Sequence, residues 1–369
     1  MHSLLRVFAS LLLLGLVTNC ADPVTPQFRF EAGFLLIEGR ITDTPGFSEI
    51  RVSRNEVLFG NYTLVPIPGS VVSSIDNEGQ EVMWAPVPAS NAYRPPADWT
   101  AEIGREYHIR VITPEGEMVE STPERLPASV PLLDARVEFE QEAYFSTTRD
   151  RFVPAFRLLT DLEDPADEKN FYQFNYSIWQ TIDVCASCER ARWRDGVCIP
   201  GPDTRFVPRW DYLCDAECWV TAQGEGRNVL SDKFFNGNRI ENVEAGRYDY
   251  DRPGGLLFVV EQYSITEGAF EFGEVLEDLA EGGSGLNAPL PAALVGNLTD
   301  LSENKTNVLG YVGTAAVNTE RVFINRDTVQ GQSLPFDGTI RLEPVRPSPP
   351  LAPCEGGTRT RVRPVGWPE

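Results

Sequence analysis

Short runs in which apolar and polar residues alternate dominate the chain from residue 34 to about residue 121. The segments FLLIEGRIT (34–42) and FSEIRVSRN (47–55) follow this pattern, and the turn signal DTPG separates them. Alternation with a period of two is typical of strands that bury one face, and Pro and Gly favour tight turns. The pairs SVVSSID with EVMWAPV and EYHIRVI with EMVEST predict two further hairpins. Roughly six or seven short strands in about 100 residues predict an immunoglobulin-like β-sandwich over residues 33–122.

The second half of the chain predicts longer strands and one helix. ARVEFE, FVPAFRLL and the strongly apolar GLLFVVEQYSI predict strands, whereas FEFGEVLEDL (270–279) has apolar residues at helical spacing. Thr266 is a candidate N-cap for this helix, and the pair Gly282-Gly283 is a stop signal. We therefore predict a mainly β fold, in which a β-rich, fibronectin III-like domain at 133–345 with one α-helix follows the sandwich. Proline-spaced residues 123–132 predict a linker, and residues 346–369 a proline-rich tail.

The first 19 residues predict a signal peptide for export. Arg6 precedes an apolar core at 7–17, which is too short for a membrane span because a spanning helix needs about 20 residues. Cys20 follows at the position where a bacterial lipoprotein is cleaved and acylated, so we expect lipidation there and a tether at 20–32. Asn19 departs from the small residue usual before such a cysteine. Ordinary secretion and an uncleaved anchor are the alternatives.

The length of the chain indicates the number of domains, and its charge excludes one class of partner. A mature chain of roughly 350 residues exceeds the usual size of one hydrophobic core, so two domains are expected. The formal net charge of −22 argues against nucleic acid as a partner, because binding to phosphates relies on Lys and Arg.

Six cysteines remain once Cys20 is assigned to lipid. Most of them fall in a predicted cysteine-rich insertion at 183–220, and one lies in the tail: Cys185, Cys188, Cys198, Cys214, Cys218 and Cys354. The even number and the oxidising export route favour disulfides, one of which would tie the tail through Cys354. The CxxC and CxxxC spacings also resemble a zinc site, and redox activity is a third alternative. Spacing alone assigns no pairs.

The sequence contains no constellation typical of catalysis. His108 is the one histidine left after removal of the signal, and its place in the strand EYHIRVI has an ordinary structural explanation. We expect no catalytic residue, no cofactor and no metal. The acidic segment at 161–168 is a weak alternative for calcium, because it lacks the loop pattern that provides six to eight oxygen ligands.

Four tryptophans lie in or beside the cysteine-rich insertion and are candidate ligand-binding residues: Trp179, Trp193, Trp210 and Trp219. They could stack against a sugar or a peptide. Packing over a disulfide-rich core is the alternative.

The order of several segments resembles the family of uncharacterised outer-membrane lipoproteins of Bacteroidetes known as domain of unknown function 4249. The matching segments are FLLIEGRITD, GREYHIRVITPEGEMVES, DEKNFYQF, CWVT, LSDKFFNG, VEQYSITEGAFEF, LVGNLTD, NVLGYVGTAAV and the ending CxGGT with a later PxxW. The resemblance implies a tethered, β-rich protein in two parts, often associated with TonB-dependent transporters and without established catalytic residues. Asn19 and the long insertion are departures from the usual pattern.

These observations lead to one expected function and two alternatives. We expect a protein anchored by lipid to the outer membrane, on its periplasmic or cell-surface face, that acts as a non-enzymatic accessory or ligand-binding partner of a TonB-dependent transporter. The alternatives are a secreted hydrolase that uses carboxylates, and an adhesin or structural protein of the envelope.

Overall fold

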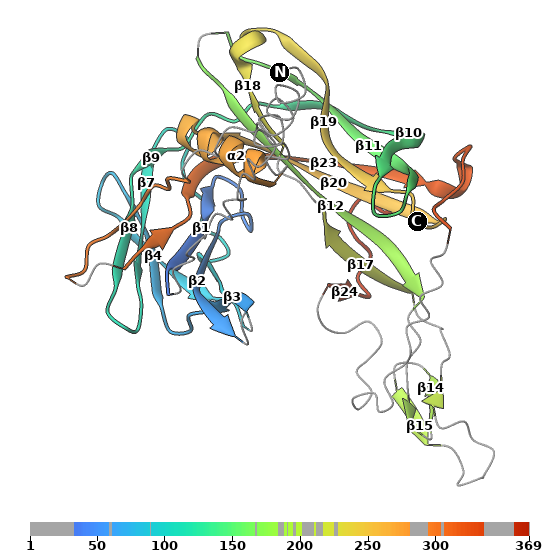
Figure 1. Cartoon of the computed structure of the whole chain (residues 1–369), viewed down its shortest axis with the longest axis horizontal. Helices are drawn as coiled ribbons and strands as arrows, with labels where there is room; N and C mark the ends of the chain where they lie inside the picture. Colours follow the sequence, from blue (N-terminus) through green and yellow to red (C-terminus); the bar gives the residue numbers. More distant parts are fainter. Residues whose placement is uncertain are drawn as a thin grey trace, which may run out of the picture.

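The computed structural model describes most of the chain, and this described part is mainly β with one α-helix (Figure 1). The described residues are 33–58, 61–88, 90–166, 168–183, 188–189, 191–194, 197–200, 210–211, 217–224, 228–280, 294–303, 306–335 and 358–368. The predicted signal peptide, the tether and Cys20 lie outside these residues, as do Cys185, Cys214 and Cys354. Among the described residues, no helix is both long enough and apolar enough to cross a membrane.

The N-terminal strands form one unit around a shared apolar core. Their bounds are β1 (Leu35–Thr42), β2 (Glu49–Leu58), β3 (Asn61–Pro66), β4 (Val71–Asp76), β5 (Glu81–Pro86), β6 (Ala92–Arg94), β7 (Glu106–Ile112), β8 (Met118–Ser121) and β9 (Glu124–Arg125). The predicted hairpins are present, since β1 pairs antiparallel with β2, β4 with β5, and β7 with β8. Ile37, Ile50 and Val52 pack with Ile109 and Val111 in the core. This arrangement is consistent with the predicted β-sandwich.

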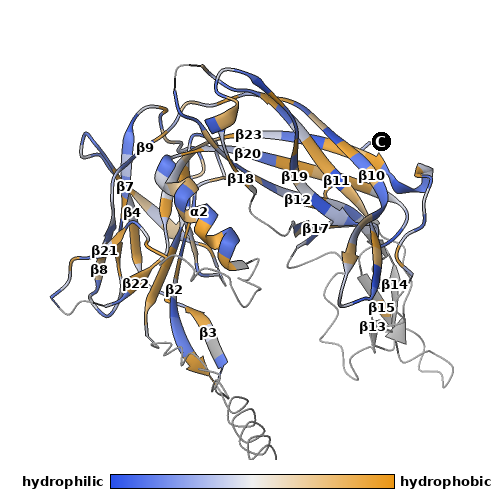
Figure 2. Ribbon diagram, turned by 45° about the horizontal axis from the view of Figure 1, so that its top comes forward, coloured by the Kyte–Doolittle hydropathy of each residue, from blue (hydrophilic) through white to orange (hydrophobic). Residues whose placement is uncertain are grey.

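The C-terminal unit is built from a three-stranded sheet and a second layer of strands that packs against it. The three-stranded sheet contains β10 (Leu132–Ser146), β11 (Arg151–Glu163) and β19 (Arg239–Asp249). The strands of the other layer are β12 (Phe171–Asp183), β17 (Glu217–Gln223), β18 (Asn228–Ser231), β20 (Gly255–Ile265), β23 (Val312–Asn325) and β24 (Arg359–Thr360). Phe156 and Leu158 of β11 pack with Phe174 of β12 and Phe258 of β20 in a second core. The colouring in Figure 2 shows the alternation of hydrophobic and hydrophilic residues along these strands.

Strands from late in the chain join the two units. The short strands β21 (Leu298–Asp300) and β22 (Val308–Leu309) pair with β8 and β1 of the N-terminal unit. The long strand β23 pairs with β1 through its first residues, in parallel, and with β20 along most of its length. One strand therefore belongs to both units, and this brings β1 close to β12 and β20.

The segment predicted as a linker is also part of the folded structure. Leu126 and Val130 are buried, and the carbonyl oxygen of Val130 accepts hydrogen bonds from the side chains of Gln262 and Asn318, both at 2.8 Å. The chain therefore passes between the units along a fixed path.

The predicted helix is confirmed as α2 (Glu267–Ala280). Thr266 caps its first turn, since the Thr266 hydroxyl oxygen accepts a hydrogen bond from the Ala269 amide at 3.2 Å. Gly273 allows the helix to approach β18, because a Cβ atom there would lie 2.8 Å from the side chain of Val229. The predicted stop signal lies outside the described residues.

The remaining short elements are 3-10 turns and hairpin strands. Their bounds are η1 (Asp232–Phe234), η2 (Arg326–Thr328), β13 (Cys188–Glu189), β14 (Ala191–Arg194), β15 (Val197–Pro200) and β16 (Trp210–Asp211). The last four strands belong to the predicted cysteine-rich insertion, of which only these pieces and β17 are described.

Candidate functional site

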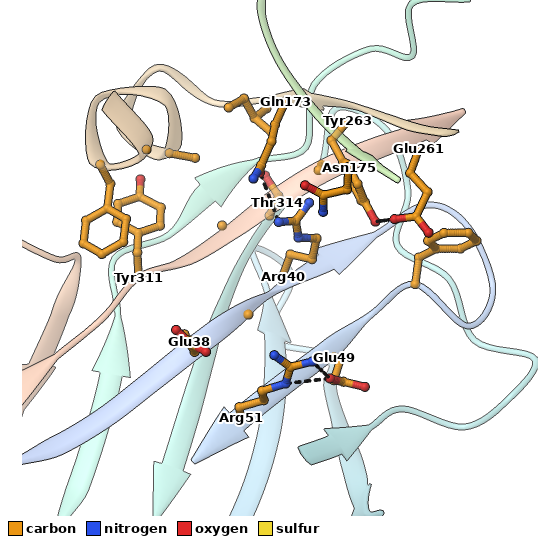
Figure 3. A pocket seen from close by; sticks show the side chains of 18 of the residues that line it. Glu38, Arg40, Glu49, Arg51, Gln173, Asn175, Glu261, Tyr263, Tyr311 and Thr314 are labelled. Carbon is orange, nitrogen blue, oxygen red and sulfur yellow. Dashed lines mark hydrogen bonds and ion pairs between the residues drawn. The ribbon is translucent and has the colours of Figure 1, made fainter. Parts of the chain in front are cut away.

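A cavity of about 500 Å³ lies where the two units meet (Figure 3). Its walls come from β1 and β2 of the N-terminal unit and from β12, β20, α2 and β23. The polar residues that line it include Glu38, Arg40, Glu49, Arg51, Arg94, Gln173, Asn175, Gln223, Glu261, Tyr263 and Thr314. This volume lies within the usual range for small-molecule sites, about 300–1,000 Å³.

Arg40 of β1 links the two units across this cavity. Its Nη2 atom donates a hydrogen bond to Oε1 of Gln173 on β12 at 3.0 Å. The guanidinium carbon also lies 4.0 Å from the centre of the Tyr263 ring on β20. A cation above an aromatic face contributes roughly 0.5–2 kcal/mol, and more when water is excluded. The guanidinium is therefore held on two sides by neutral groups of the C-terminal unit.

The aromatic ring in contact with this guanidinium belongs to Tyr263. Its side chain is buried, and its hydroxyl donates a hydrogen bond to Oε2 of Glu261 at 2.7 Å. Burial raises the pKa of Tyr263 above its ordinary value; Arg40 opposes this shift and Glu261 adds to it. The phenol therefore stays protonated at neutral pH and remains a hydrogen-bond donor.

The opposite wall carries an ion-paired cluster. Glu49 of β2 lies 2.8 Å from Arg51 and 2.6 Å from Arg94. The side chains of both arginines are more than half exposed, at 54% and 53%. Such pairs contribute at most about 1 kcal/mol to stability, but they neutralise the carboxylate of Glu49.

Thr314 of β23 contributes a buried hydroxyl without a partner. The residue is 2% exposed, and no group in the described part of the chain forms a hydrogen bond with its Oγ1 atom. Its backbone N–H donates to Oε2 of Glu124 at 3.2 Å. A buried hydroxyl without a hydrogen bond costs about 1–3 kcal/mol, so its position next to a cavity calls for an explanation.

Glu124 of β9 joins the N-terminal unit to the base of α2. Its carboxylate accepts hydrogen bonds from the hydroxyls of Thr266, at 3.0 Å, and Tyr311, in addition to the backbone of Thr314. Burial raises the pKa of Glu124, and these hydrogen bonds offset only part of the shift. Gly268 and Gly313 leave room for the cluster, because a Cβ atom at Gly268 would lie 2.4 Å from the Tyr311 hydroxyl.

The predicted tryptophan platform lies elsewhere in the C-terminal unit. Trp219 of β17 is buried and packs edge to face on Trp367, with ring centroids 6.3 Å apart. Trp179 is half-buried on β12. The side chains of Trp193 on β14 and Trp210 on β16 lie outside the described residues. No tryptophan that the structure describes lines the cavity, and the contact of Trp219 corresponds to the packing alternative.

The candidate cysteines are described only in part. Cys218 is fully buried and disulfide-bonded, and its partner is not among the described side chains. Cys188 and Cys198 are described only as backbone, on β13 and β15. Disulfide pairing of the six cysteines therefore stays a prediction.

The acidic segment considered for calcium has structural partners. Asp161 lies 3.1 Å from Arg136 and 2.8 Å from Arg239. Burial alone would raise the pKa of Asp161, but the Asn242 amide and the two arginines outweigh it and lower the pKa to about 2. Asp164 accepts hydrogen bonds from the Tyr172 hydroxyl and the Gly237 amide. Within the described residues, no group of three or more His, Cys, Asp or Glu could hold a metal ion.

His108 lies on β7, opposite Ile75 of β4. It is half-buried and does not line the cavity between the units.

Fold and site together define a two-part β protein with a polar cavity between its parts. The chain belongs to the family defined by a domain of unknown function, DUF4249, whose model matches residues 21–321. This match confirms the family resemblance deduced from the order of segments. No curated protein matches the chain.

Proposed function

We propose that this protein is a non-enzymatic, lipid-anchored, ligand-binding accessory of an outer-membrane TonB-dependent transporter. The observation that supports this proposal is the cavity of about 500 Å³ between the units. Ligand sites often lie at domain interfaces, with a few converging polar groups on a mostly preformed surface. Here a guanidinium, two amides and an aromatic ring converge.

The position of the cavity supports a role in capture and release. Arg40 belongs to the N-terminal unit, whereas Gln173 and Tyr263 belong to the C-terminal unit. A ligand that contacts all three would strengthen the contact between the units. In an accessory protein, binding to the transporter would weaken this contact and release the ligand.

The anchor and the finer fold assignments belong to the same proposal. Acyl chains on Cys20 would hold the protein at the outer membrane, on either face. An immunoglobulin-like unit would lie next to the tether, and a fibronectin III-like unit with its disulfides would lie farther out. The buried, disulfide-bonded Cys218 supports the expectation of an oxidising compartment.

Gentle detergent extraction tests the partnership most simply. The native protein would be extracted from outer membranes, cross-linked and analysed by mass spectrometry. We expect peptides of a TonB-dependent transporter cross-linked to this chain. A Cys20→Ala variant should incorporate no labelled fatty acid, leave the membrane fraction and lose these cross-links. Recovery of the anchored protein without any transporter would contradict the proposal.

A carboxylate-dependent hydrolase is the second candidate, because Glu38, Glu49 and Glu261 all line the cavity. Two of these carboxylates already have partners, since Glu49 contacts arginines and Glu261 accepts from Tyr263. Turnover of a chromogenic glycoside panel that is lost in Glu261→Gln but kept in Glu49→Gln would favour this candidate. Binding to host or matrix material without a transporter would favour the third candidate, an adhesin.

A further inference from the structure

We infer that the cavity recognises its ligand through a carboxylate group, which Arg40, Thr314 and the side-chain amides of Gln173 and Asn175 would hold. This inference rests on the proposed ligand-binding function and specifies the chemistry of the ligand. An acidic sugar and the carboxyl end of an amino acid or peptide are two sources of the same group.

Arg40 is preorganised for an anion. Its guanidinium carbon lies 4.0 Å from the centre of the Tyr263 ring, and its Nη2 atom donates a hydrogen bond to Gln173 at 3.0 Å. A planar guanidinium matches a carboxylate through two parallel hydrogen bonds, and charge-assisted bonds of this kind are about twice as strong as neutral ones. Fixing the side chain before binding also lowers the entropic cost of the complex.

The hydroxyl of Thr314 is a second group suited to a carboxylate. This group is buried, lines the cavity and lacks a hydrogen-bond partner in the described part of the chain. Figure 3 shows Thr314 beside Arg40 and Gln173. A hydroxyl can donate to a carboxylate oxygen, so a bound carboxylate would satisfy a group that is otherwise costly to bury.

The side-chain amide of Gln173 presents a donor to the cavity. Its Oε1 atom accepts a hydrogen bond from Arg40, and its NH₂ group can only donate. Asn175, two residues along β12, brings a second amide to the same wall, and Figure 3 shows both side chains gathered around Arg40. Asn175 also bonds to the Tyr263 hydroxyl. The donors on Arg40 and Gln173 suit an anion better than a cation.

The carboxylates of the cavity do not cancel this preference. Glu49 is paired with two arginines, and Glu261 accepts from the Tyr263 hydroxyl. Glu38 lies on β1 two residues before Arg40, on the cavity wall. It would suit the hydroxyl of a sugar or the ammonium of an amino acid, so the rest of the ligand is expected to carry donors.

Matched pairs of small molecules test the inference on the full-length protein purified in detergent. The probes are glucuronic acid with glucose, and alanylalanine with its C-terminal amide, measured by saturation-transfer NMR and calorimetric titration. We expect at least one acid to bind about tenfold more tightly than its neutral partner, as for other charge-assisted bonds. The pair that shows the difference identifies the source of the carboxylate.

Three variants separate recognition from folding. Arg40→Gln should remove the preference for the acid. Thr314→Val should weaken acid binding several-fold without lowering the melting temperature, because it removes a buried hydroxyl that lacks a partner. The control Arg149→Gln changes an exposed arginine that pairs with Asp249 outside the cavity and should leave the preference intact.

Equal binding of acid and neutral probes would overturn the inference but leave ligand capture in place. If neither acid binds, the inference is also overturned. The transporter cross-links test the proposed function independently.

Discussion

The guanidinium of Arg40 lies 4.0 Å from the centre of the Tyr263 ring, although β1 and β20 are far apart in the sequence. This contact joins the N-terminal unit to the C-terminal unit at the wall of the cavity. The same contact therefore stabilises the junction between the units and forms part of the wall of the proposed site.

Replacement of Tyr263 should separate the roles of its ring and its hydroxyl. Tyr263→Phe keeps the ring under Arg40 but removes the donor to Glu261, and we expect a loss of about 1 kcal/mol in the free energy of unfolding. Tyr263→Leu removes both contacts and should cost about 1–3 kcal/mol more. Urea denaturation measures both values, and equal stability of the two variants would contradict the stacking role of the ring.

The buried carboxyl of Glu124 predicts a pH dependence of stability. Its pKa is raised in the folded state, so the folded state binds more protons than the unfolded state above the ordinary pKa of 4.5. The free energy of unfolding should therefore fall as the pH rises from this value through the folded pKa. Glu124→Gln should remove this contribution.

Urea denaturation of both proteins at a series of pH values measures the difference directly. Subtracting the free energies of unfolding of Glu124→Gln from those of the native protein removes effects of the overall net charge of −22. A difference that stays constant with pH would show that Glu124 keeps an ordinary pKa.

Asp161 predicts the opposite dependence. Its pKa is lowered to about 2 from the ordinary 3.8, so its contribution is present above pH 3.8 and is lost as the pH falls through about 2. Asp161→Asn should cost about 1–3 kcal/mol at pH 7, with the cost shrinking in acid. The control Asp134→Asn alters a more exposed acid that also contacts Arg136 and should have little effect at any pH.

Trp367 connects the C-terminal end of the chain to the body of the protein. Its ring packs on Phe323 at 5.0 Å and on Trp219 at 6.3 Å, although it lies beyond the residues matched by the family model. Trp367→Ala should lower the free energy of unfolding by about 1–3 kcal/mol and expose Trp219, which fluorescence quenching by acrylamide would detect. Val365→Ala, at a residue that is 78% exposed, should change neither measurement.

The sequence predicts the elements that depend on local pattern. Alternation in β1 and β2 and helical spacing with the Thr266 cap in α2 both depend on neighbouring residues, and both are found. The parallel pairing of β1 with β23 depends on a contact between distant segments, which periodicity does not encode.

The cavity was missed for the same reason. Arg40, Gln173, Tyr263 and Thr314 come from four separate strands. Each lies in one of the segments that carry the family resemblance, but no local pattern indicates that these segments meet. The tryptophans were predicted as ligand-binding residues because large aromatic rings can stack against a sugar or a peptide. The site depends instead on an ordinary arginine that tertiary structure places above a tyrosine.

The most direct test of ligand binding at the junction is mass spectrometry of what the native protein carries. Full-length protein, Arg40→Gln and the control Arg149→Gln would be isolated from outer membranes under identical conditions, denatured, and analysed for released small molecules. We expect a molecule bearing a carboxylate to be released by the native protein and by the Arg149 variant but not by the Arg40 variant. Release of the same molecules in the same amounts by all three proteins, or of none by any of them, would contradict ligand binding at the cavity.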